Sequence, residues 1–295
     1  MKKALIAIDP SEMPEENLES LSGIITHFQS RGFFSELSIV SVIHPDMYLT
    51  PLQWFKEMKP TLVKQAVEQI AGKLGNRFHF TSIKILSSES DGLESLTRVV
   101  TRYGKRTGHR LLVVASHNRK GLPHWFLGSF SETAALTAAL PILVVKPDLA
   151  LEEFSPEPLI VIGVDPAVPL PASTLRWIAD CCRGTAARID LIYVKPRPRP
   201  LWDKLQPPRQ GKDPLLMLQN LVTKLNKAGV HATALQKDET TSVAQTLVDH
   251  AEQERAWVIM TLNDQRITLR KLLLGSTSRR TLCLTRRPFL SLRLD

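Results

Sequence analysis

The sequence of 295 residues contains few cysteines, and none stands at the spacing that metal sites or disulfide frameworks use. Its 3 cysteines are the adjacent Cys181 and Cys182 and the distant Cys283. A structural zinc site is built from pairs such as Cys-x-x-Cys, and small disulfide-rich domains need several cysteines at regular spacing. We therefore expect no metal site and no disulfide scaffold, and we expect these thiols to be buried.

Long apolar runs are also absent. A membrane-spanning helix needs roughly 20 consecutive apolar residues, and no stretch of the sequence comes near that length. Lys2 and Lys3 precede a short apolar run that ends at Asp9, without the small-residue cleavage site of a signal peptide. We therefore expect this run to be a first β-strand, and the protein to be cytoplasmic without membrane insertion.

Two well-known catalytic motifs are missing as well. No Gly-x-x-x-x-Gly-Lys-Ser/Thr loop is present, and Gly-Ser-Phe-Ser at 128–131 lacks the glycines of a nucleophile elbow. The tryptophans are scattered and form no base-stacking platform. The net charge of +9 favours anionic partners without naming one. Among these partners we expect a nucleotide rather than nucleic acid.

What the sequence does contain is an internal repeat. Residues 127–132 read Leu-Gly-Ser-Phe-Ser-Glu, and residues 274–279 read Leu-Gly-Ser-Thr-Ser-Arg. Each copy then reaches a proline at the same spacing, followed by a short apolar run, and each half opens with an apolar run that ends in Asp-Pro. The repeat predicts one domain over 1–147, a linker rich in proline and glutamate over 148–158, and a second domain over 159–295.

Apolar runs alternate with helix-length segments in both halves. Near-continuous apolar runs are typical of parallel strands covered on both faces. We expect an α/β fold with two doubly wound, Rossmann-like domains, each with a five-stranded parallel sheet. The expected strands are 4–8, 37–43, 82–86, 111–115 and 142–146 in the first half, and 159–164, 189–194, 231–236, 257–262 and 289–294 in the second.

Candidate ligand residues gather where these strands end. Asp9 follows the first strand, and the segment from Ala115 to Gly128 follows the fourth. In open parallel sheets, ligands bind outside the carboxyl ends of the strands. Gly128, Ser129 and Ser131 open the last helix of the first half, whose N-terminal N–H groups suit a phosphate. The serines can equally be helix caps alone.

These residues resemble the universal stress protein family, in a tandem arrangement that covers nearly the whole chain. The nucleotide-binding members have Gly, two residues, Gly, nine residues and Gly with Ser or Thr after the fourth strand. The first copy matches this spacing with Ala115, Asn118 and Gly128-Ser129, and the second with Leu262, Gln265 and Gly275-Ser276. The family's acidic residue after the first strand corresponds to Asp9 and Asp165, and its apolar adenine-contacting residue corresponds to Val42 and Val194.

The resemblance implies an adenine nucleotide, ATP or AMP with Mg²⁺, bound in the first domain. We expect the contacts from Asp9, Val42, Ala115, Asn118, Gly128, Ser129 and Ser131. Because Leu262 and Gln265 are bulky where phosphates would lie, we expect the second domain to be degenerate.

We predict a stress-response regulatory protein without catalytic residues, with ATP hydrolysis slow at most. The family's subunits commonly pair through their last strands, so we expect the two domains to pack as an intramolecular pseudo-dimer, with homodimerisation of the chain open. The alternative is a nucleotide-independent interaction protein whose pockets are structural or hold a different ligand.

Overall fold

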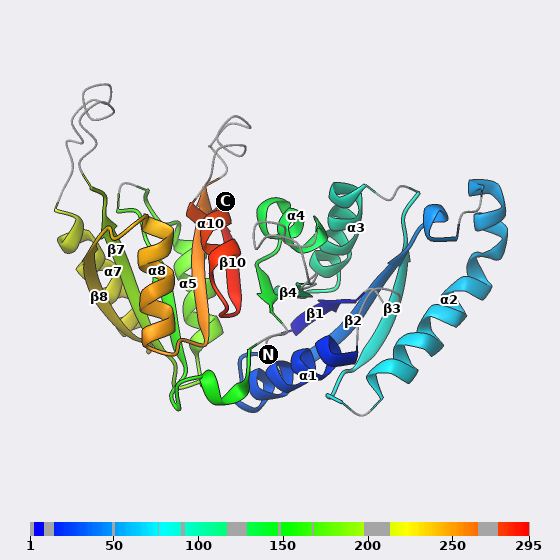
Figure 1. The fold of residues 1–295 in the computed structure, drawn as a ribbon, viewed down its shortest axis with the longest axis horizontal. Helices are drawn as coiled ribbons and strands as arrows, with labels where there is room; N and C mark the ends of the chain where they lie inside the picture. Colours follow the sequence, from blue (N-terminus) through cyan, green and yellow to red (C-terminus); the bar gives the residue numbers. More distant parts are fainter. Residues whose placement is uncertain are drawn as a thin grey trace, which may run out of the picture. The chain divides into compact units, whose positions relative to one another are not determined.

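The chain folds into two compact units, Met1–Leu151 and Glu152–Asp295, each an α/β domain. The structure is a computed structural model. It describes residues 3–8, 15–48, 51–75, 77–89, 92–116, 129–146, 149–166, 168–197, 213–264 and 277–294. Within these ranges, strands and helices alternate along each unit as the apolar pattern predicted (Figure 1).

The first unit has a parallel sheet in the order β3-β2-β1-β4-β5. Its strands are β1 (Lys3–Ala7), β2 (Glu36–Ile43), β3 (Ser82–Ser87), β4 (Leu111–Ala115) and β5 (Ile142–Val145). Its helices are α1 (Glu15–Ser30), the 3-10 turn η1 (Pro45–Tyr48), α2 (Leu52–Leu74), α3 (Leu93–Arg106) and α4 (Ser129–Thr137). Helices α1 and α2 cover one face of the sheet, and α3 and α4 cover the other (Figure 1).

The second unit repeats this order as β8-β7-β6-β9-β10, also parallel. After the 3-10 turn η2 (Leu151–Glu153), its strands are β6 (Leu159–Gly163), β7 (Arg188–Lys195), β8 (His231–Asp238), β9 (Val258–Asp264) and β10 (Phe289–Leu294). Its helices are α5 (Ala172–Cys182), α7 (Pro214–Lys227), α8 (Val243–Gln253) and α10 (Thr277–Leu284). The two sheets confirm the predicted fold class of two doubly wound domains.

The core lies in the middle strands, which explains their continuous apolar runs. Ile6 on β1, Val113 on β4 and Val161 on β6 are each 0% exposed, because helices cover both faces of each strand. Gly32 and Gly184 end α1 and α5 at positive φ, 75° and 78°. Glycine reaches this region without the strain that a Cβ adds, so these residues stop their helices as predicted.

Helix α2 is longer than the sequence indicated. The sequence predicts a helix from roughly Pro60 to Leu74. Instead α2 begins at Leu52 and contains Pro60 in its interior. The buried residues of α2 are Phe55, Leu62, Ala66, Ile70 and Leu74. This apolar stripe extends on both sides of Pro60, so packing outweighs the loss of one helical N–H.

The segment between the domains also differs from expectation. Its proline and glutamate residues favoured an exposed linker, but Leu149 is 3% and Phe154 4% exposed. Phe154 packs on Trp257 with ring centroids 5.6 Å apart. The backbone N–H of Ser155 donates to the carbonyl of Arg255 at 2.8 Å. Residues 152–158 are therefore bound to the second domain, while the packing of the two domains as a pseudo-dimer stays a prediction.

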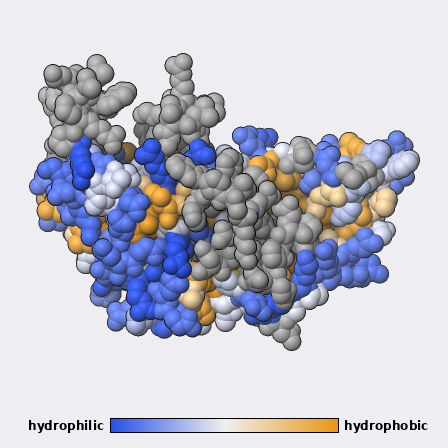
Figure 2. All heavy atoms as spheres, in the orientation of Figure 1, coloured by the Kyte–Doolittle hydropathy of each residue, from blue (hydrophilic) through white to orange (hydrophobic). Residues whose placement is uncertain are grey.

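Hydrophilic residues dominate the surface of the second domain on the face seen in Figure 2, with hydrophobic residues in small areas among them. Within the described ranges, we find no helix long and apolar enough to cross a membrane.

Candidate functional site

The carboxyl ends of β1, β2 and β4 form the candidate site of the first domain. Ala7 on β1 pairs with Val40 on β2 and with Val114 on β4. Val42 and Ala115 are therefore at the ends of the two strands that flank β1, and both are partly exposed. This is where the strand order reverses, the position at which doubly wound sheets bind ligands. Two of the predicted contacts thus come to the same edge of the sheet.

The start of α4 provides the other described part of this site. Ser129 is the first residue of α4, and Ser131 is 3% exposed. A helix start carries N–H groups without helical partners and the positive end of the helix dipole, so it attracts anions. Glu132 also lies in this first turn, and its carboxylate has the same charge as a phosphate. The predicted contacts Asp9, Asn118 and Gly128 lie outside the described residues.

The equivalent edge of the second domain is more enclosed. Val194, at the end of β7, is 4% exposed, whereas Val42 at the equivalent position is partly exposed. Leu262 on β9 is partly exposed. Asp165, after β6, is exposed, and its carbonyl accepts a hydrogen bond from the N–H of Val168 at 3.0 Å. Val194, which corresponds to the family's adenine-contacting residue in the second copy, is therefore buried.

A contact between Arg197 and Glu239 lies beside this covered position. The backbone N–H of Arg197 donates to Glu239 Oε2 at 2.8 Å, and Arg197 Nε donates to the carbonyl oxygen of Glu239 at 2.9 Å. Glu239 is only 4% exposed. Sequence reasoning did not find this pair, because a glutamate after a strand is usually a solvated loop residue. We call the two residues the Arg197–Glu239 clasp.

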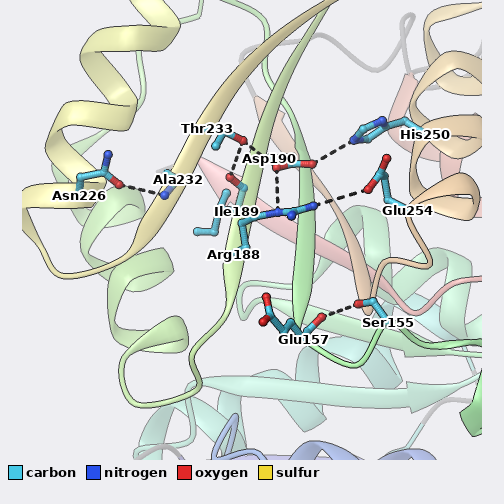
Figure 3. A network of polar contacts seen from close by, with 10 residues as sticks. All are labelled: Ser155, Glu157, Arg188, Ile189, Asp190, Asn226, Ala232, Thr233, His250 and Glu254. Carbon is cyan, nitrogen blue, oxygen red and sulfur yellow. Dashed lines mark hydrogen bonds and ion pairs between the residues drawn. The ribbon is translucent and has the colours of Figure 1, made fainter.

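A second polar cluster lies within the second domain, between β7, β8 and α8 (Figure 3). Asp190 accepts hydrogen bonds from Thr233 Oγ1 at 2.7 Å and contacts His250 Nε2 at 3.1 Å. Arg188 Nε lies 3.5 Å from Asp190 Oδ1, and the same guanidinium reaches Glu254 at 3.6 Å. Asp190 and His250 are 3% and 5% exposed.

The surroundings of Asp190 favour its ionised form. Burial raises the pKa of this carboxyl, but hydrogen bonds from His250 and Thr233 outweigh burial, aided by the charges of Arg188 and His250. The net pKa of Asp190 lies below the ordinary aspartate value. Asp190 is the third residue of β7, near the amino ends of the strands and away from the ligand-binding edge. The cluster therefore fastens α8 to the sheet rather than forming part of the candidate site.

Metal binding has no support in the part of the chain that the structure describes. No group of three or more histidine, cysteine, aspartate or glutamate side chains there could hold a metal ion. His117 and His124, which the sequence places in the loop after β4, lie outside this part. The carboxylate that a nucleotide-bound Mg²⁺ would approach, Asp9, lies outside it too.

Comparison with known proteins agrees with the duplicated fold. The model of the universal stress protein family matches residues 1–146 and again residues 159–291. No curated protein matches the chain. Among solved structures, a universal stress protein from Archaeoglobus fulgidus aligns with a TM-score of 0.67 and 14% identity, covering 99% of this chain and 96% of that chain.

Two further solved structures align with the chain. A universal stress protein candidate from Pseudomonas aeruginosa aligns with a TM-score of 0.58 and 14% identity, covering 100% of this chain and 94% of that chain. A universal stress protein from Archaeoglobus fulgidus in complex with dAMP aligns with a TM-score of 0.33 and 17% identity, covering 47% of this chain and 98% of that chain. Since the family model matches both halves, the chain belongs to the universal stress protein family and carries two copies of its domain.

Proposed function

We propose that this chain is a cytoplasmic stress-response regulatory protein whose first domain binds an adenine nucleotide, ATP or AMP. The observation that carries the proposal is the exposure of Val42 at the end of β2, at the same edge of the sheet as Ala115 at the end of β4. An apolar side chain that stays partly open at the switch point of a parallel sheet suits a flat base. The equivalent Val194 of the second domain is 4% exposed.

The phosphates of the nucleotide would lie at the start of α4. We propose that the N–H groups at the start of α4 bind the phosphates, together with the hydroxyls of Ser129 and Ser131. The segment from Asn118 to Gly128 would add further contacts to the phosphates. Asp9 would contact the ribose or a Mg²⁺ ion that the nucleotide brings. The bulky Leu262 and Gln265 of the second copy favour the first domain as the binding domain.

The alternative function is nucleotide-independent interaction with a protein partner. Two observations favour it. Glu132 places a carboxylate in the turn that would receive the phosphates. The segment over η1 and the start of α2 exposes large apolar side chains, namely Tyr48, Leu52, Trp54 and Met58. Trp54 is the most exposed of these four side chains, at 61%. Aromatic residues are enriched in protein interfaces.

Mass spectrometry of the small molecules released from the purified, denatured chain separates the two functions. Nucleotide binding predicts ATP or AMP among the released molecules, and saturable heat when the ligand-free chain is titrated with either nucleotide. A chain that releases no nucleotide and gives no heat with ATP or AMP contradicts the proposal and favours the interaction protein.

A further inference from the structure

The structure assigns the Arg197–Glu239 clasp a role in ligand selection: it closes the adenine position of the second domain, so that the tandem chain has one adenine site instead of two. This inference rests on the proposed function, because it takes the ends of β2 and β7 as adenine positions. It names the two residues that make the copies differ.

Register places Glu239 on the same side of the sheet as Val194. Val194 pairs with Lys237 across β7 and β8. Side chains two residues apart along an extended chain point the same way, so Glu239 lies on the Val194 side, one step nearer the carboxyl edge. The Glu239 carboxylate then reaches the backbone N–H of Arg197, three residues after Val194, at 2.8 Å. The Glu239 side chain thus crosses the end of β7 on the side of the sheet where Val194 is buried.

Hydrogen bonds hold the main chain at the Glu239 end of the clasp. The N–H of Glu239 donates to the carbonyl of Lys195 at 3.0 Å, which extends the β7–β8 ladder by one bond. The next residue, Thr240, donates its N–H to Thr246 Oγ1 at 2.9 Å. Thr246 lies on α8 and donates its own hydroxyl to the carbonyl of Ser242 at 3.0 Å. Because backbone bonds on either side fix the main chain of Glu239 beside β7, its carboxylate leaves β7 by losing the hydrogen bond from the N–H of Arg197.

The first domain cannot form the same contact. Its equivalent of Glu239 is Ser88, whose N–H donates to the carbonyl of Ile43 at 3.0 Å. The short Ser88 side chain lies 3.4 Å from the hydroxyl of Ser95 on α3, not across β2. Its equivalent of Arg197 is Pro45, and proline has no N–H to donate. One residue lacks the carboxylate and the other lacks the donor, so Val42 stays partly exposed.

Adenosine is the probe that tests the clasp most directly. It lacks phosphates, so the bulky Leu262 and Gln265 do not decide the outcome. In calorimetric titrations of the full chain, we expect one adenosine site in the wild type and two in Glu239→Ala. The affinity of the new site should be within about tenfold of that of the first, since the two sites then differ in few contacts.

Three further variants complete the test. Glu239→Gln keeps a side-chain oxygen that accepts from Arg197, so it should retain a single site. Ser88→Ala, the matched change in the first domain, should leave the stoichiometry unaltered. Arg197→Pro gives the second domain the first-domain residue and removes the donor while Glu239 stays in place. Arg197→Pro should therefore open the second adenosine site. This variant replaces Glu239→Ala in the test if Glu239→Ala does not fold.

The outcomes also separate this inference from the proposed function. One site in the wild type and still one in folded Glu239→Ala and Arg197→Pro overturns the clasp and leaves the function intact. No site in the wild type but one in the clasp variants overturns binding by the first domain and supports the clasp. No adenosine binding in any of these chains overturns both.

Discussion

At the scale of single residues, the two copies differ most where their second strands end. Val42 is partly exposed, but Val194 is 4% exposed and lies beside the Arg197–Glu239 clasp. The first turns of their last helices also differ, since Glu132 of α4 corresponds to Arg279 of α10. We propose that these single side chains decide which copy accepts a ligand, although the strands beneath them are alike.

Glu132 should weaken nucleotide binding by the first domain. A carboxylate in the first turn of a helix repels a phosphate at the same helix start, by about 0.3–1 kcal/mol. Glu132→Gln should therefore tighten ATP binding roughly two- to fivefold. Titration calorimetry measures this change. Glu94→Gln is the control, because Glu94 occupies the first turn of α3, away from the proposed phosphates. Equal tightening in both variants, or none in Glu132→Gln, would contradict this position for the phosphates.

Asp9 should support ligand binding but not efficient catalysis. A hydrolase needs a positioned base or a metal-activated water at the phosphates. Asp9 is the carboxylate that the strand pattern places at this site, and the family resemblance assigns it to ligand contact. ATP with Mg²⁺ should therefore turn over far more slowly than the usual enzyme range of about 1–1000 per second. Phosphate release by the purified chain measures the rate. A rate within that range that Asp9→Ala abolishes would require a catalytic role for the first domain.

Asp190 should make the second domain sensitive to acid. Its pKa is lower in the folded state than in the unfolded chain. Its contribution to stability is thus complete above the ordinary aspartate pKa, about 3.9, and is lost as the pH falls through the lower folded value. At pH 7, Asp190→Asn should cost roughly 2–4 kcal/mol, since it removes a charge from a buried hydrogen-bonded cluster.

Urea unfolding at pH 7 and pH 3 measures this dependence. The wild type should lose more stability on acidification than Asp190→Asn, because only the wild type loses the paired charge. Asp180→Asn is the control, since Asp180 pairs with Arg183 at the surface and is 35% exposed. If Asp190→Asn and the wild type lose equal stability between the two pH values, the pairing does not stabilise the domain.

At the scale of secondary-structure elements, the sequence predicted the strands well because their residues are buried on both faces. Residues 111–115 were expected as a strand and form β4. Helix α2 was mispredicted at its start, because Pro60 indicated a helix beginning while packing of Phe55 and Leu62 extends the helix past it. The polar contacts of Glu239 could not be predicted, since they join residues 42 apart in sequence.

The segment before β6 should behave as part of the second domain. Phe154→Ala should destabilise that domain by about 3–5 kcal/mol, the usual cost of removing a buried phenylalanine side chain. Leu151→Ala, whose side chain is 40% exposed, is the control and should cost about 0.5 kcal/mol. Chemical denaturation of the full chain, followed by circular dichroism, measures both changes. Equal, small effects of both variants would indicate a linker without structural role.

At the scale of the whole molecule, the duplication predicted two similar domains, and the family model matches both. The candidate site could be predicted only in outline. The family resemblance placed Val42 and Ala115 at the ends of two strands, and in the structure these strands are β2 and β4, which flank β1. In the proposed account, Val194 is covered by the side chain of Glu239, which follows the next strand, β8. Residue spacing within one motif does not reveal such a contact. The tandem chain thus keeps one fold twice while its two ligand-binding edges diverge.

The central claim is that the first domain alone binds an adenine nucleotide, and calorimetric titration of the full chain with ATP and Mg²⁺ tests it. The compared chains are the wild type, Gly128→Trp and Gly275→Trp, whose tryptophans block equivalent positions at the starts of α4 and α10. We predict one site in the wild type, retained in Gly275→Trp and lost in Gly128→Trp. Absence of binding to the wild type, or equal loss of affinity in both variants, would contradict the claim.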